Sequence, residues 1–195
     1  ELESYSLVTR ADETPSFTVH RLVQEVTRRG ANAATLGEAL GWIDDAFVGE
    51  TQDVRDWPVL DPLLPHVRAV AGRADEAGIA TPTALLMNRA GLLLFGKALH
   101  AKAEPLMRRA LAIDEQSFGA EHPNVARDLN NLAQLLKDTN RLAEAEPLMR
   151  RALAIFVASL GADHPNSQTV MGHGEEEVLE RFQSLQRELL GQPST

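Results

Sequence analysis

Apolar residues recur at helical spacing through the middle of the chain. Leu129, Leu132, Ala133 and Leu136 lie at i, i+3, i+4 and i+7, which predicts an amphipathic helix. A polar turn follows at residues 138–140, and a second apolar stripe begins directly after it. The members of that second stripe are Ala145, Leu148, Met149, Ala152 and Ile155. The pattern therefore predicts two consecutive helices joined by a short turn.

This pair of helices occurs twice in the sequence. Residues 103–125 and 145–167 are offset by 42 positions and are identical at 17 of 23 of them. The segments before them, 84–102 and 126–144, match more loosely. A helix pair of this kind cannot bury both of its faces alone, so a repeated unit must stack on its neighbours.

Proline and glycine separate the units. Pro105 and Pro147 are expected in the first turn of their helices, where a missing N–H costs little. The linkers at 119–124 and 161–166 share the pattern Gly-Ala-[Glu/Asp]-His-Pro-Asn, which should end one unit and begin the next. The linker residues His122 and His164 are equivalent members of this pattern, and we interpret both as part of the repeat.

The stretch Asn130-Asn131-Leu132-Ala133, followed by Leu136, Ala145, Met149 and Ala152, resembles the tetratricopeptide repeat. The 42-residue period and the two linkers are similar to those of the kinesin-light-chain subclass. The resemblance implies an all-α fold, a right-handed superhelical stack of antiparallel helix pairs. It also implies a concave groove lined by the first helix of each unit, which binds a protein or a peptide.

Transferred onto this sequence, the inward-facing positions of that family predict a groove rich in amides and cations. Amide side chains can bond an extended peptide backbone, and Arg or Lys can pair with its carboxylates. Asn recurs at the equivalent positions 88 and 130, which favours a groove over a merely solvated helix face. The candidate groove residues are Asn88, Arg89, Arg127, Asn130, Asn131, Gln134 and Lys137.

A third unit begins at residue 168 but loses the repeat signature. Val178, Phe182, Leu185 and Leu189 nevertheless keep a helical period, so a long amphipathic helix is expected over about 175–190. We interpret it as a terminal helix that covers the last repeat. The acidic run Glu175–Glu177 would suit the N-terminus of that helix, with a docking surface as the alternative.

The first thirty residues read differently. β-Branched runs on either side of a polar turn over residues 4–20 predict a hairpin, followed by a helix that ends at Gly30. This stretch resembles the tail of the winged-helix domain in STAND-class signalling ATPases, the NB-ARC group, with Val19-His20-Arg21 in place of the Met-His-Asp motif. The resemblance implies that His20 could sense a nucleotide in a longer parent, and the alternative is a solvent-facing or helix-capping histidine. Since the sequence starts at Glu1 rather than Met, we expect an excised piece of a longer protein.

Two further helices are predicted before the repeats. Leu36, Leu40, Ile43 and Phe47 form one stripe over residues 33–47. Asp61-Pro62 is expected to cap and open the second helix, which carries a further stripe and ends near Gly78. The members of that stripe are Leu64, Val67, Val70, Ala71 and Ala74. The pair resembles the degenerate helices that precede the repeats in bacterial NB-ARC proteins.

Composition and charge narrow the function. Leu and Ala supply 28 and 27 of 195 residues, which favours helices over sheets. With 28 acidic and 19 basic residues the formal charge is −9, a poor match for nucleic acid. No apolar run reaches the length of a membrane helix, and the absence of Cys fits a reducing compartment, so the expected location is the cytoplasm.

Chemistry-bearing motifs are weak. The segment from Gly91 to Lys97 fits the ATP-loop spacing, but Ala98 stands where Ser or Thr must reach Mg²⁺, and the segment reads as helix interior. The six His residues show no metal-binding spacing, and no nucleophile elbow is present. We therefore expect no enzyme activity, no metal and no cofactor.

The predicted organisation has four parts: a winged-helix tail at 1–30, a degenerate helical pair at 31–80, two tetratricopeptide repeats at 81–167, and a capping helix and tail at 168–195. The leading hypothesis is a protein-binding sensor arm of a STAND-type ATPase, which a double substitution of Arg127 and Asn130 would weaken without loss of helicity. The alternatives are a self-associating scaffold, visible by light scattering, and nucleotide binding, visible as an ATP- or ADP-induced melting shift.

Overall fold

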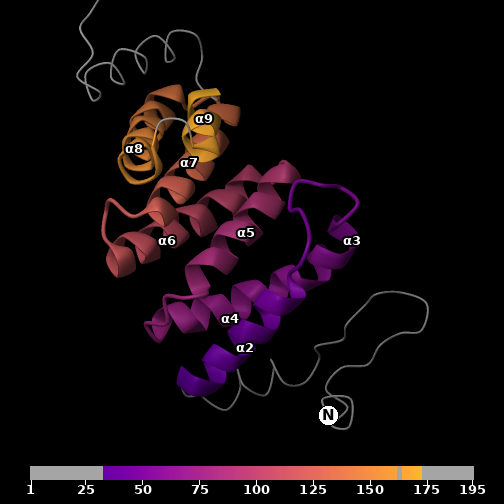
Figure 1. The fold of residues 1–195 in the computed structure, drawn as a ribbon. Helices are drawn as coiled ribbons and strands as arrows, with labels where there is room; N and C mark the ends of the chain where they lie inside the picture. The colour runs from indigo at the N-terminus through magenta and orange to yellow at the C-terminus, as the bar shows by residue number, and fades with distance from the viewer. Residues whose placement is uncertain (1–32, 162–163, 173–195) are drawn as a thin grey trace, which may run out of the picture. The chain divides into compact units, whose positions relative to one another are not determined.

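The computed structural model describes residues 33–161 and 164–172, and every regular element in this part is helical (Figure 1). The chain divides into two compact units between Ile113 and Asp114, within one helix. The elements are α2 (Ala33–Ala46), α3 (Trp57–Leu60), the 3₁₀ turn η2 (Asp61–Leu63), α4 (Leu64–Glu76), α5 (Thr83–Gly96), α6 (His100–Phe118), α7 (Pro123–Asp138), α8 (Leu142–Leu160) and α9 (Pro165–Gly172).

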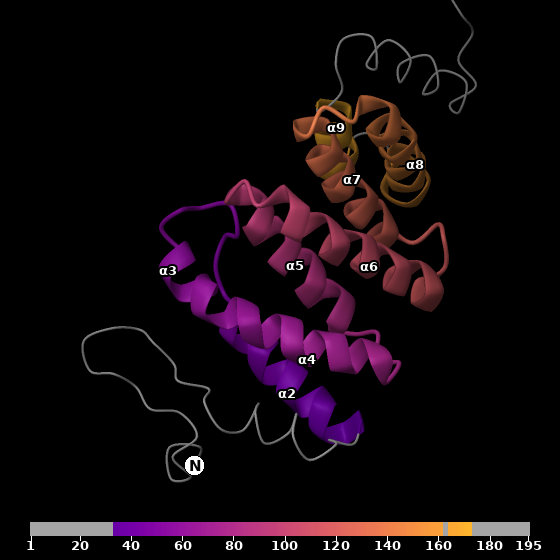
Figure 2. The same cartoon turned by 180° about the vertical axis from the view of Figure 1, so that it is seen from behind.

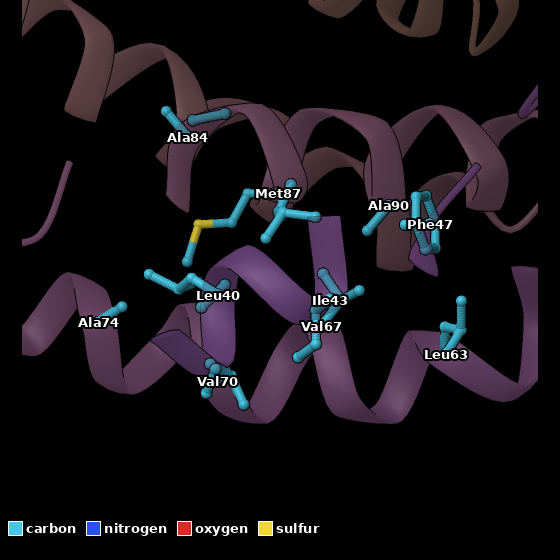
Figure 3. Packing of buried hydrophobic residues seen from close by; sticks show 14 of the residues in the cluster. Leu40, Ile43, Phe47, Leu63, Val67, Val70, Ala74, Ala84, Met87 and Ala90 are labelled. Carbon is cyan, nitrogen blue, oxygen red and sulfur yellow. The ribbon is translucent and has the colours of Figure 1, made fainter. Parts of the chain in front are cut away.

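The core of the first unit lies among α2, α4 and α5. Figure 3 shows Leu40 and Ile43 of α2 between Val67 and Val70 of α4 and Met87 of α5. All of these side chains are buried, and so is the rest of the stripe predicted over 33–47. Burial of this apolar area is the main force that holds the three helices together. The two helices expected before the repeats are therefore confirmed.

In the second unit α7 packs along α8, and α8 packs against α9 (Figure 2). The predicted stripe of α7 is buried, including Leu129 and Leu136. On α8 the residues Ala145, Met149, Ala152 and Ile155 are buried, and Leu148 is partly exposed. Both helices of the second copy therefore have the faces that the sequence predicts.

The helix ends follow the repeat. Gly119 and Gly161 have φ of +85° and +91°, a conformation that glycine adopts without steric cost. At Asn140 φ is +60°, and at the equivalent Ala98 it is +56°. The turn predicted at 138–140 is confirmed, since α7 ends at Asp138 and α8 begins at Leu142.

Three predicted positions at helix starts are wrong. Asp61 does not cap a helix, because the chain is already helical from Trp57, and the Asp61 carboxylate accepts a hydrogen bond from Lys97. Pro105 and Pro147 lie at the sixth residue of α6 and α8 rather than in the first turn. These helices begin directly after the turns that contain Ala98 and Asn140, so each proline removes one hydrogen bond from the second turn.

Several predictions fall on residues outside the described part. They are the hairpin over 4–20, the helix ending at Gly30, the role of His20, and the amphipathic helix over 175–190. These remain predictions.

Candidate protein-binding face

The candidate face lies on α7. Arg127, Asn130, Asn131, Gln134 and Lys137 are all partly exposed and follow i, i+3, i+4, i+7 and i+10, so they form one stripe. We call this stripe the amide face. The residues of α7 that flank the stripe on both sides are buried, so the stripe is the part of the helix that faces away from the core. The structure thus brings five of the seven predicted groove residues onto one helix face.

Arg127 is engaged within its own unit. Its Nη2 lies 2.9 Å from Oδ1 of Asp128 and 3.3 Å from Oδ2 of Asp114, and its Nε donates to the same Asp128 oxygen at 3.1 Å. The side chains of Asp114 and Asp128 are only 4% and 1% exposed. Because two buried carboxyl groups surround one guanidinium, Arg127 adds less positive potential to the amide face than its charge suggests.

Burial raises the pKa of Asp114 above its usual range. The positive charge of Arg127, a hydrogen bond with Asp128 and the proximity of His122 all oppose this effect, but burial outweighs them. The folded cluster therefore binds a proton more tightly than an exposed aspartate does.

The amides of the face are positioned for hydrogen bonding. Asn130 and Asn131 are adjacent, and Gln134 lies one turn further along. The Nε2 atom of Gln134 is buried and has no hydrogen-bond partner in the described structure. A side-chain amide offers two donors and a carbonyl acceptor, so the adjacent Asn130 and Asn131 have the groups that pair with the alternating N–H and C=O groups of an extended chain.

Asn88 and Arg89 belong to the first unit. Asn88 is 1% exposed, so most of its surface faces the interior. The Arg89 guanidinium donates to the carbonyl oxygen of Phe47, lies 5.1 Å from the centre of the Phe47 ring and is 3.6 Å from Asp44. These contacts tie α5 to the end of α2.

The segment resembling an ATP loop is helix, as expected. Gly91 lies inside α5, and a Cβ there would be 2.7 Å from Cγ of Met107, so the glycine permits close packing rather than phosphate binding. Lys97 pairs with Asp61 and lies 4.8 Å from the Trp57 ring.

The two linker histidines cap helices. Nδ1 of His122 accepts the backbone N–H of Asn124, and Nδ1 of His164 accepts that of Asn166, both at 3.2 Å. The imidazole thus satisfies one of the free N–H groups at the start of each helix. Among the residues that the structure describes, no group of acidic or histidine side chains is arranged to hold a metal ion. No described helix has both the length and the apolar character needed to cross a bilayer.

Sequence reasoning missed Asp114 and Asp128. A signal was available in the repeat itself. At the 42-residue offset, Phe156 is equivalent to Asp114, and both Val170 and Leu86 are equivalent to Asp128. These three apolar residues are buried. An aspartate at a position that is apolar in the other copies indicates a buried polar cluster.

Comparison with known proteins agrees with the repeat. Residues 82–158 match the model of the tetratricopeptide repeat family. This module is non-catalytic and generally mediates protein–protein interaction. The crystal structure of BtubC (BKLC) from P. vanneervenii is similar at 15% identity and a TM-score of 0.47, over 78% of this chain and 69% of that chain. No curated protein matches the chain in sequence.

Proposed function

We propose that the tetratricopeptide repeats of this chain bind a protein through an extended peptide segment, and that the amide face of α7 is the main contact. The observation that carries the proposal is the partly exposed run of Asn130, Asn131 and Gln134 on a helix whose other sides are buried. Side-chain amides carry both donors and an acceptor, which match the N–H and C=O groups of a peptide backbone. In this proposal the helix pairs stack as a right-handed superhelix.

The groove would recognise backbone more than acidic side chains. Asp114 and Asp128 already surround the guanidinium of Arg127, and Arg89 is held by Phe47 and Asp44. An acidic ligand would have to compete with these contacts. Neutral extended segments are therefore expected to bind at least as well as acidic ones.

The test is peptide binding. Extended peptides are selected against the chain from a displayed random library, and the affinity of the best ones is compared between wild type and Asn130→Ala/Asn131→Ala. Loss of two amide contacts should weaken binding by about tenfold or more. Arg127 is left intact, because its removal would disturb two buried carboxyl groups.

Gln116→Ala supplies the control, since Gln116 is an exposed amide on α6 outside the stripe. Equal affinity of the double variant and wild type would overturn the assignment of the face. If the chain selects no peptide and light scattering shows concentration-dependent assembly, the alternative of a self-associating scaffold is favoured instead.

We also propose that this binding module is the sensor arm of a cytoplasmic STAND-type signalling ATPase. The support is the resemblance of Val19-His20-Arg21 and its surroundings to the end of a winged-helix domain. The coding sequence upstream of Glu1 tests it: a P-loop and a Walker-B pattern are expected there, and their absence from an open reading frame would contradict the proposal.

A further inference from the structure

Two helix junctions of the second unit can be compared directly. We call residues 114–128 the α6–α7 joint and residues 156–170 the α8–α9 joint, which are related by the 42-residue offset. Both contain a glycine with positive φ and a histidine that caps the following helix. They differ in their interiors, because the first buries Asp114 and Asp128 where the second buries Phe156 and Val170.

The α6–α7 joint is an unusual place for two acids. Arg127 is the guanidinium between them, and its side chain is 35% exposed. Glu115, the next acid along α6, pairs with Arg151 of α8 at 2.5 Å and so lies in a separate ion pair. Two almost fully buried carboxyl groups therefore share one partly exposed guanidinium.

If both carboxyl groups ionise, one guanidinium balances only one of the two negative charges, and the second charge is unfavourable at so buried a position. Protonation of one of the two carboxyl groups is therefore favoured. The apolar residues at the equivalent positions show that the repeat does not need acids there in order to fold. The buried acids thus make the α6–α7 joint depend on carboxyl protonation, which the apolar interior of the α8–α9 joint does not.

We propose that a bound proton stabilises the α6–α7 joint. One proton shared between Asp114 and Asp128 holds the last turn of α6 against α7, and loss of this proton as pH rises weakens that contact. This goes beyond peptide binding, since it concerns the stability of α7 whatever α7 binds. It gives the helix that bears the amide face a built-in response to pH.

The direction follows from the pKa. In the folded chain the pKa of Asp114 is raised, whereas in the unfolded chain it has the usual value of about 3.9. The folded joint therefore binds the proton more tightly. The proton's stabilisation is complete below about pH 3.9 and is lost as pH rises through the folded value.

His122 is the second titratable group that faces the cluster. Its ring stacks on Phe118 with centroids 4.6 Å apart, and its Nδ1 accepts the N–H of Asn124. A protonated imidazole cannot accept that bond. His122→Asn keeps a hydrogen-bond acceptor at the helix start but has no ionisable group, so a pH response that remains in this variant comes from the carboxyl groups.

Backbone hydrogen exchange of the full chain tests the proposal. Protection of the α7 amides, corrected for the intrinsic rate, is measured from about pH 4, near the pKa of an unfolded aspartate, to about pH 8 in wild type and in the His122→Asn background. It should fall as pH rises, by no more than about tenfold per pH unit, the limit for one proton. The α9 amides, which follow the apolar joint, provide an internal control and should show no such fall.

Asp114→Asn should abolish the fall, because the amide cannot ionise. Asp138→Asn, at an exposed position at the end of the same helix, should leave it in place. A fall of equal slope in Asp114→Asn, or flat protection in wild type, would overturn the proposal. Carboxyl ¹³C titration of the wild type tests the proposal even if Asp114→Asn fails to fold. The proposal is wrong if Asp114 and Asp128 both titrate near pH 3.9, as exposed aspartates do.

Discussion

In the second unit, the end of α6 meets α7 and the end of α8 meets α9 at equivalent positions of the repeat. The glycine, the histidine cap and the proline at the first position of the next helix are common to both joints. The interior differs, with two acids and an arginine in one joint and apolar side chains in the other. The comparison teaches that the backbone of this junction is set by local signals at the helix ends, which leaves the buried positions open to different chemistry.

Transplanting an acid between the joints should have the largest effect. Val170→Asp places a carboxylate at a fully buried site of α9 where Thr169, not arginine, precedes it. A buried charge without its partner costs about 3–5 kcal/mol. The loss is smaller if α9 detaches from α8 at a lower cost, because the carboxylate then reaches water. Hydrogen exchange of α9 measures the loss. Thr169→Asp, on the exposed side of the same helix, is the control and should cost far less.

Removal of the arginine from the α6–α7 joint should have the second-largest effect on stability. Arg127→Thr copies the residue of the other joint and leaves Asp114 and Asp128 without their shared guanidinium. The expected loss is about 1–3 kcal/mol, less than for a fully buried pair because Arg127 is partly exposed. Urea unfolding checks this value. A triple variant that also carries Asp114→Phe and Asp128→Val should recover stability, and a failure to do so would mean that the two joints differ in more than these residues.

The helix pairs offer a third comparison, between Gly91 of α5 and the equivalent Ala133 of α7. In Gly91→Ala the new Cβ would lie 2.7 Å from Cγ of Met107, so α5 or Met107 must move. A net loss of about 1–2 kcal/mol is expected, since overpacking outweighs the gain in helix propensity. Gly72→Ala is the matched control. Its Cβ would meet nothing within 4 Å, and it should stabilise α4 by about 0.5–1 kcal/mol.

Loss of either histidine cap should lower the free energy of unfolding by less than Gly91→Ala does, and the two losses should be similar. His122→Ala and His164→Ala each remove one acceptor for a backbone N–H, at a cost of about 1 kcal/mol. His122 should lose slightly more because its ring also stacks on Phe118. Thermal unfolding of both variants, with His→Asn at each site as the control, measures the difference. Equal stability of His122→Ala and wild type would remove the capping role.

The local features of this fold were readable from the sequence because they depend on residues close together in the chain. The stripe of α7, the turn at Asn140 and the stripe of α2 are of this kind. The partners of Arg127 were not foreseen, because one of them, Asp114, lies 13 residues away, and nothing in a helical period says that an aspartate is buried. The cap predicted at Asp61 is wrong because the chain is already helical from Trp57, and the carboxylate of Asp61 pairs instead with Lys97, 36 residues away. The residues of the amide face were predicted from the resemblance to the tetratricopeptide repeat, whereas the reduced cationic character of that face depends on these longer-range contacts.

The smallest effect is expected where the two copies agree completely. Glu104 pairs with Arg108 at 2.8 Å on α6, and the equivalent Glu146 pairs with Arg150 at 2.5 Å on α8. Such i,i+4 pairs on exposed helix faces contribute about 0.3–0.5 kcal/mol, because water screens them and two long side chains must be ordered. Glu104→Gln and Glu146→Gln should therefore each change the free energy of unfolding by less than about 0.5 kcal/mol. A loss above about 1 kcal/mol in either variant would show that solvent screening is weaker on these faces than their exposure implies. The ion pairs of the polar joint would then no longer stand apart from those of the helix surface.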